Sequence, residues 1–148
     1  MESGKEKTVV FETPSDWSKS DDPYIRYYSG QAVYETSFDL DASVLNAKSA
    51  VLDLGAVCVM AQVELNGQDL GTLWLAPWTV DVPVALLRQK NNVLKITVAN
   101  LWCNRLIGDA SLPEDQKSTW TSHRFYGSGD NQLQPSGLLE PVTLNVEM

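Results

Sequence analysis

Apolar and polar residues alternate along several short stretches of the chain, the pattern of strands that bury one face. The clearest stretch is 93–99, where leucine, isoleucine and valine alternate with lysine and threonine. Residues 33–40 alternate in the same way, and residues 142–146 supply a last strand. Residues 50–59 are almost continuously apolar, which predicts a central strand covered on both faces.

Turn signals separate these stretches. Residues 61–65 and 70–74 flank Asn66-Gly67, a pair that tolerates the positive φ of a tight hairpin turn. A short strand is expected at 78–82, and Pro83 favours a single helical turn over 83–89. Many short strands, frequent turns and almost no helix predict an all-β sandwich or barrel. A further short strand is expected at 8–12.

The length of 148 residues predicts a single domain. Residues 1–16 are expected to form an N-terminal extension with a first strand, and residues 17–148 the sandwich. The formal net charge of -8 argues against nucleic acid and anionic membrane surfaces as partners. No apolar run approaches the roughly 18 residues of a membrane span, and the charged first residues lack the apolar core of a signal peptide.

Residues 101–137 are expected to be largely irregular, and connections longer than about 15 residues are often binding loops. Sugars stack on aromatic rings and hydrogen-bond to polar side chains, and this segment supplies both kinds of group. An alternative is that the rings cover the core. The core is favoured for Trp74, Trp78 and Trp102, while Trp120 and Tyr126 are evenly balanced. The candidate sugar-binding residues are Trp102, Asn104, Arg105, Asp109, Trp120, His123, Arg124 and Tyr126.

Arg105 and Asp109 have two interpretations. They can form a salt bridge that pins the loop, or they can hold ligand hydroxyls. The structural role is favoured, because arginine is often used in this way. Asn104 is expected to organise the same loop.

Independent catalysis has little support. Two suitably spaced carboxyl groups are needed for glycoside hydrolysis. The loop offers Asp109, Glu114, Asp115 and Asp130 as candidates, but random placement in an acidic loop explains them as well. A catalytic barrel of about 250 residues does not fit in this chain. No G-x-S-x-G elbow lies near His123. The chain is therefore not expected to be an enzyme by itself.

No cofactor is expected. His123 is the only histidine, which makes zinc improbable on ligand grounds. Structural calcium stays open, because it needs only oxygen ligands. A Cys58–Cys103 bridge also stays open, since spacing does not decide it. The aspartates available for calcium are Asp16, Asp21, Asp22, Asp39, Asp109 and Asp130.

Four segments carry a family resemblance: LNGQDLGTLW, APW, NNVLKITVANLW and NRLIGD. They resemble the sugar-binding β-sandwich domain attached to large glycoside hydrolases, closest to the accessory domain of family 106 α-L-rhamnosidases. More distantly, they resemble the family 2 domain of β-galactosidases and β-glucuronidases. NLWxNRLIGD is the more specific motif. Cys103 stands where the family commonly has proline, and Glu140 where it commonly has glycine.

The resemblance implies a jelly-roll, galactose-binding-like fold and a non-catalytic module of a rhamnosidase-like glycoside hydrolase. Its expected partners are carbohydrate and a catalytic domain, and its parent enzyme would be compatible with a secreted or periplasmic location. One alternative is a freestanding carbohydrate-binding protein. A small hydrolase is the third and least favoured reading.

Overall fold

The computed structural model of the chain describes residues 7–10, 12–121 and 133–148. The strands are β1 (Gln31–Phe38), β2 (Ser49–Asp53), β3 (Val57–Cys58), β4 (Met60–Leu65), β5 (Gln68–Leu73), β6 (Thr79–Asp81), β7 (Asn92–Ala99), β8 (Gly137–Leu138) and β9 (Thr143–Glu147). Within the described residues they form a four-stranded sheet in the order β1-β7-β4-β5 and a three-stranded sheet in the order β6-β2-β9. β3 pairs with β8.

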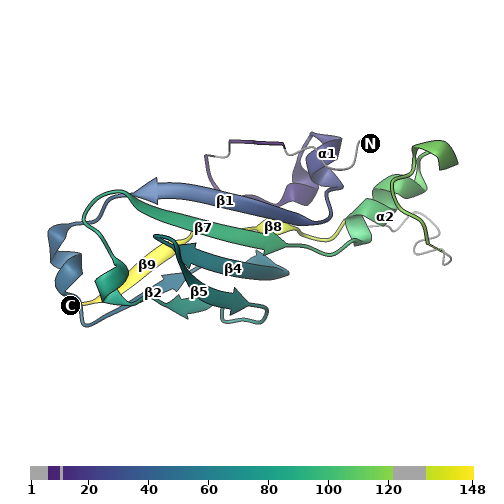
Figure 1. Ribbon diagram of the computed structural model, residues 1–148. Helices are drawn as coiled ribbons and strands as arrows, with labels where there is room; N and C mark the ends of the chain where they lie inside the picture. Colours follow the sequence, from purple (N-terminus) through teal and green to yellow (C-terminus); the bar gives the residue numbers. More distant parts are fainter. Residues whose placement is uncertain (1–6, 11, 122–132) are drawn as a thin grey trace.

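Short helices flank the two sheets. They are α1 (Pro23–Arg26), α2 (Cys103–Ala110), and the 3-10 turns η1 (Trp17–Lys19), η2 (Ala42–Asn46), η3 (Val84–Leu86) and η4 (Glu114–Gln116). Figure 1 shows α1 near the start of β1, and α2 extending beyond the sheets at the end opposite the C-terminus. η3 confirms the helical turn predicted after Pro83.

The hydrophobic core lies between the two sheets. Val63 of β4 is paired with Ile96 of β7, and both side chains are buried. Leu52 of β2 joins the same buried cluster from the opposite sheet. Burying an aliphatic side chain of this size contributes about 1.5–3 kcal/mol to stability. The alternation in β1 and β7 is therefore confirmed, as is the all-β sandwich.

One predicted strand is wrong. Residues 50–59 do not form a continuous strand, because β2 ends at Asp53 and β3 begins only at Val57. The Asp53 carboxylate accepts a hydrogen bond from the amide of Gly55 at 2.8 Å, and Gly55 has φ 66. This turn redirects the chain, so the second half of the apolar run pairs with β8. Residues 8–10 and 12 of the expected first strand are not in a strand.

The predicted hairpin between β4 and β5 is confirmed, with φ of 52 at Asn66 and 84 at Gly67. The side chain of Asn66 also joins separate elements. Its amide donates to the carbonyl of Leu86 at 2.8 Å, and its carbonyl accepts from the amide of Val93 at 2.8 Å. Asn66 therefore fastens the turn to η3 and to the start of β7.

Trp17 closes the opposite end of the core. Its indole Nε1 donates to the Tyr34 hydroxyl at 2.6 Å, and the two rings stack with centroids 6.1 Å apart. The amide of Leu138 donates to the same hydroxyl at 3.1 Å. Gly137 lies directly against this pair with φ 99, so a side chain there has no room. The N-terminal segment thus becomes part of the sandwich.

We predict that Gly137→Ala destabilises the fold by about 3–5 kcal/mol, because close contact adds to backbone strain. A Cβ at this position would lie 2.5 Å from Trp17 Nε1. Gly71→Ala is the control: its φ is 113 but its Cβ would meet no atom within 4 Å, so the expected cost is only about 1–2 kcal/mol. Urea unfolding measures both, and equal losses would contradict the packing role of Gly137.

Candidate functional site

The segment predicted to be an irregular loop begins with a helix, α2 (Cys103–Ala110). That part of the prediction is wrong. Apolar residues do recur with the i, i+3, i+4, i+7 spacing of a helix, at Cys103, Leu106, Ile107 and Ala110. The helix is only eight residues long, however, and its buried residues also include polar ones, Asn104, Arg105 and Asp109. Gly108 allows close packing against Tyr27, because a Cβ would lie 2.6 Å from the Tyr27 Cγ.

Asn104 fastens α2 to the chain that leads into β8. Its side-chain amide donates to the carbonyl of Gln134 at 2.7 Å and to the Ser136 hydroxyl at 3.1 Å. Its side-chain carbonyl accepts from the amide of Gln134 at 2.7 Å. Asn104 is fully buried. Its side chain therefore links α2 to the segment before β8 inside the domain.

Asp109 holds the chain that follows α2. Arg105 Nη2 donates to its Oδ1, so the predicted salt bridge is present and buried. The amides of Ser118 and Thr119 donate to its Oδ2 at 3.0 and 2.8 Å. The Thr119 hydroxyl adds a third bond at 2.7 Å. The Arg105–Asp109 pair thus holds the segment after α2 in place, as expected. The hydroxyls of Ser118 and Thr119, which also bind Asp109, could not be identified as its partners from the sequence pattern.

The ionised form of Asp109 is favoured despite its burial. Burial raises the pKa of this carboxyl, but hydrogen bonds from Thr119, Arg105 and Ser118 lower it by more. The pKa therefore lies below the usual aspartate value. Because Asp109 stays charged at neutral pH, it can keep all of these donors satisfied.

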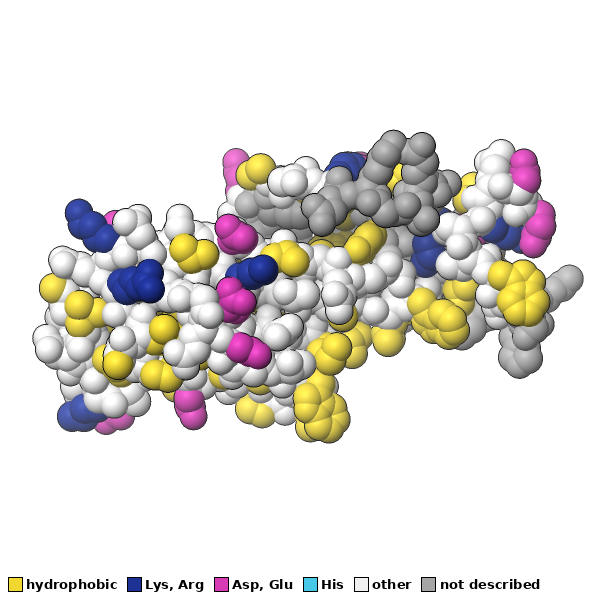
Figure 2. Space-filling view, viewed as in Figure 1, with side chains coloured by type: hydrophobic (Ala, Val, Ile, Leu, Met, Phe, Trp, Pro, Cys, Tyr) yellow, Lys and Arg dark blue, Asp and Glu magenta, His cyan; other side chains and the backbone are white. Residues whose placement is uncertain are grey.

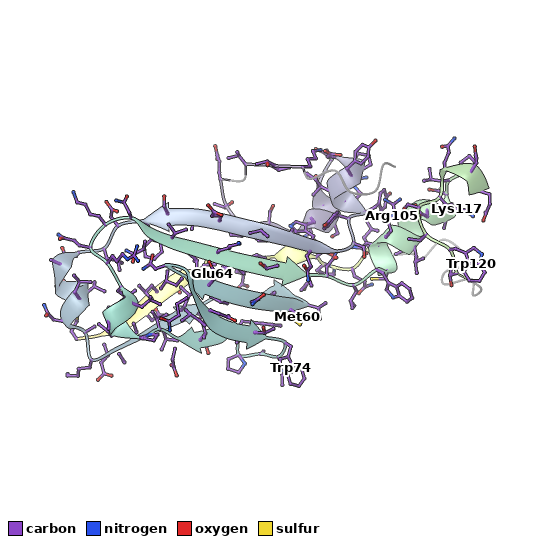
Figure 3. The ribbon with its side chains drawn as sticks, viewed as in Figure 1. Met60, Glu64, Trp74, Arg105, Lys117 and Trp120 are labelled. Carbon is purple, nitrogen blue, oxygen red and sulfur yellow. The ribbon has the colours of Figure 1, made fainter. Side chains whose placement is uncertain are left out.

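Two of the aromatic candidates, Trp102 and Trp120, adjoin this buried network in the chain, but their rings lie on the surface. Trp120 is 80% exposed and Trp102 is 61% exposed. Trp74 is 73% exposed, whereas Trp78 packs against the core. The core assignment is thus confirmed for Trp78 and wrong for Trp74 and Trp102. Figure 3 shows Trp120 beyond α2, away from Trp74.

The remaining candidate sugar-binding residues, His123, Arg124 and Tyr126, lie outside the described residues. Sugar binding by any of the eight candidates stays a prediction. Shallow depressions in the described part of the chain include one beside Trp17 and Leu139 and one beside Ala50 and Val84. None of the candidate residues lines either depression.

Within the described ranges, no group of three or more His, Cys, Asp or Glu side chains is placed to hold a metal ion. Asp16, Asp22 and Asp39 instead accept bonds from backbone amides. Structural calcium stays a prediction. Cys58 and Cys103 are both free thiols. No helix in the part of the chain that the structure describes is long and apolar enough to cross a membrane.

Together these features define a class of protein: a β-sandwich module whose polar helix residues fasten its own parts together. Comparison with known proteins gives the family. Residues 7–131 match the family described as "Glycosyl hydrolase 2 galactose-binding domain-like". The chain belongs to this family, and its galactose-binding-like fold is confirmed.

Similar proteins are glycoside hydrolases many times longer than this chain. The chain is 43% identical to the rhamnosidase from Novosphingobium sp. PP1Y, with a TM-score of 0.77, over 88% of this chain and 12% of that one. It is 35% identical to the "Putative beta-glucuronidase" of Formosa agariphila over 93% of this chain and 14% of that protein.

A more distant likeness is to the Bifidobacterium dentium beta-glucuronidase complexed with coumarin-3-O-glucuronide. The identity is 26% and the TM-score 0.52, over 61% of this chain and 15% of that one. The chain thus corresponds to an accessory domain within glycoside hydrolases and spans only a small share of each.

We predict that Asn104→Ala lowers the free energy of unfolding by about 2–4 kcal/mol, because the buried Ser136 hydroxyl and the backbone of Gln134 lose their hydrogen bonds to this side chain. Chemical denaturation of the 148-residue chain measures this loss. Asn145→Ala, at an exposed position on β9, is the control and should change stability by less than about 0.5 kcal/mol. A loss of unfolding free energy as small as that of the control would show that the hydrogen bonds of Asn104 are not needed for stability.

We also predict that Asp109→Asn costs about 2–4 kcal/mol at pH 7, because it weakens a buried charge network. The folded pKa lies below the unfolded value of about 3.9. The stabilisation is therefore complete above that value and is lost as the pH falls through the folded pKa. The gap between wild type and variant should narrow below about pH 4.

Thermal melts from pH 2 to 7 test this pH dependence, with exposed Asp115→Asn as the control. A gap that stays constant with pH would mean that the charge of Asp109 contributes nothing.

Proposed function

We propose that the chain is a non-catalytic accessory module of a rhamnosidase-like glycoside hydrolase, and that it contributes Trp120 to a carbohydrate-contacting surface. The observation that carries the proposal is the way in which Trp120 is held. Its neighbour Thr119 donates both its amide and its hydroxyl to the buried carboxylate of Asp109. The ring is nevertheless 80% exposed. A large exposed ring on an anchored backbone suits stacking against a sugar.

Preorganisation is the physical advantage of this arrangement. A ligand that binds a mobile loop must also order it, which subtracts from affinity. Ser118 and Thr119 are already tied to α2 through Asp109, so little ordering of the backbone before Trp120 is required. Tryptophan also offers a large contact area for only two side-chain rotations.

The absence of independent catalysis is supported by the placement of the acidic residues. Glu114 and Asp115 are exposed on η4, and Glu114 pairs with Lys117 at 2.6 Å. Asp109 is occupied by Arg105 and the Ser118–Thr119 segment. Their exposure and their existing partners favour structural roles for these three carboxylates over the facing pair that glycoside hydrolysis requires.

A freestanding carbohydrate-binding protein is the second candidate. The exposure of both Trp102 and Trp120 favours it, because open rings can stack sugars without a catalytic domain. The two candidate functions predict different glycan affinities for the isolated chain. A freestanding binder holds glycans by itself, whereas an accessory module acts within the enzyme that carries it.

We predict that Trp120→Ala, in the full-length enzyme that carries this chain, raises KM for rhamnose-containing oligosaccharides about tenfold. That factor corresponds to about 1.4 kcal/mol, the scale of one aromatic contact. kcat should be unchanged, because the lost contact exists in both the ground state and the transition state. Steady-state kinetics measures both constants.

Tyr24→Ala provides the control, because Tyr24 is another exposed ring, on α1. A Trp120 variant with the KM of the wild type would remove this residue from the sugar-contacting surface. Saturable glycan binding by the isolated chain, lost on Trp120→Ala, would favour the freestanding alternative.

A further inference from the structure

One end of the four-stranded sheet carries a group of exposed apolar side chains. We name it the end patch; it consists of Val59, Met60, Trp74, Leu75, Leu101 and Trp102. Trp74 and Leu75 are the most open, at 73% and 68% exposed. Their positions fall in three separate parts of the sequence, so only the fold brings them to one place.

Strand register explains the grouping. Ala61 of β4 pairs with Leu73 of β5 at the end of their ladder, so Met60 and Trp74 lie just beyond that last pair. Met60 is paired with Ala99 of β7, two residues before Leu101. Figure 3 shows Met60 and Trp74 at the same end of the sheet, and Figure 2 shows hydrophobic side chains in a row along the lower right margin.

The end patch is also free of charge. The chain has 19 acidic and 11 basic residues. Segments 54–63, 70–80 and 96–104, which contain the patch, have none of them. With roughly 150–250 Å2 of surface for each aromatic ring, the patch exposes on the order of 600 Å2. Soluble monomers rarely leave a larger apolar patch open unless a partner covers it.

We propose that the end patch docks onto an apolar, uncharged surface of the catalytic domain in the same polypeptide. The proposal rests on the proposed function. The lengths of similar enzymes support it: this chain spans only 12% of one of them and 14% of another. In such an enzyme the rest of the polypeptide is covalently attached, so it is always close to the end patch.

The size of the patch fits an intramolecular partner better than a second copy. Standard interfaces between separate proteins bury about 800 Å2 on each side, and obligate dimers bury more. A tethered domain needs less, because the linker holds its partner at an effective concentration in the millimolar range. An area on the order of 600 Å2 therefore suits docking within one chain.

The side chains also fit protein better than carbohydrate. Sugar sites combine rings with converging polar groups. Val59, Met60, Leu75 and Leu101 have no hydroxyl, amide or charge with which to bind a sugar. Interfaces between proteins, in contrast, are enriched in tryptophan and methionine and depleted of lysine and glutamate at their centre. The end patch has this composition.

The test uses the full-length enzyme that carries this chain, with Trp74→Ser and Trp102→Ser combined. The wild-type module should unfold together with the catalytic domain in calorimetry. In the double variant the module should melt as a separate, earlier transition. Cleavage of the connecting segment in limited proteolysis should be at least tenfold faster. Tyr24→Ser, at an exposed ring outside the patch, should behave as wild type.

Folding is checked on the isolated 148-residue chain, where the double variant should keep the wild-type Tm because both rings are exposed. If it does not, Leu75→Gln with Leu101→Gln replaces it. Wild-type calorimetry and proteolysis in a correctly folded patch variant would overturn the proposal. A patch-dependent dimer of the isolated chain, or patch-dependent glycan binding, would also overturn it. The Trp120 kinetics are separate, so either proposal can fail alone.

Discussion

The fold depends on satisfying the polar backbone of residues 134–138, where the chain enters the buried end of the sandwich. From one side, Asn104 of α2 binds both the amide and the carbonyl of Gln134. From the other side, Asp16 accepts the amide of Ser136, and the amide of Trp17 donates to the Ser136 carbonyl. Unpaired polar groups in such a place are costly. Parts of the chain more than 100 residues apart are therefore held at one point.

This constraint also decides the orientation of α2. Because its polar residues Asn104, Arg105 and Asp109 point inward, Trp102 is left on the surface just before the helix. Asp109 then fixes the chain after the helix, which leaves the neighbouring Trp120 exposed. The exposure of these rings is thus a consequence of internal hydrogen bonding. It is not a failure to complete the core.

The same chemistry explains what the sequence could reveal. Strands β1, β4 and β7 were predictable because their alternation is set by one buried face. The helix α2 was harder to recognise, because its apolar spacing covers only eight residues and its buried side also contains polar side chains. The break at Gly55 was missed because a long apolar run conceals it. The Arg105–Asp109 pair was predictable from the frequent structural pairing of arginine with carboxylates. Exposure of Trp74 was not, because hydrophobicity alone does not say whether the surface that covers a ring lies inside the domain or outside it.

That last distinction separates the two exposed regions of this module. Trp120 is flanked in the sequence by serine, threonine and, two residues further back, lysine. The end patch joins two rings to four aliphatic side chains across three uncharged segments. Exposure of such a surface to water is unfavourable, because its burial against an apolar partner contributes about 25 cal/mol of free energy per Å2. Under the two proposals, the regions differ in what they meet: a carbohydrate ligand stacks on Trp120, and the rest of the polypeptide covers the end patch.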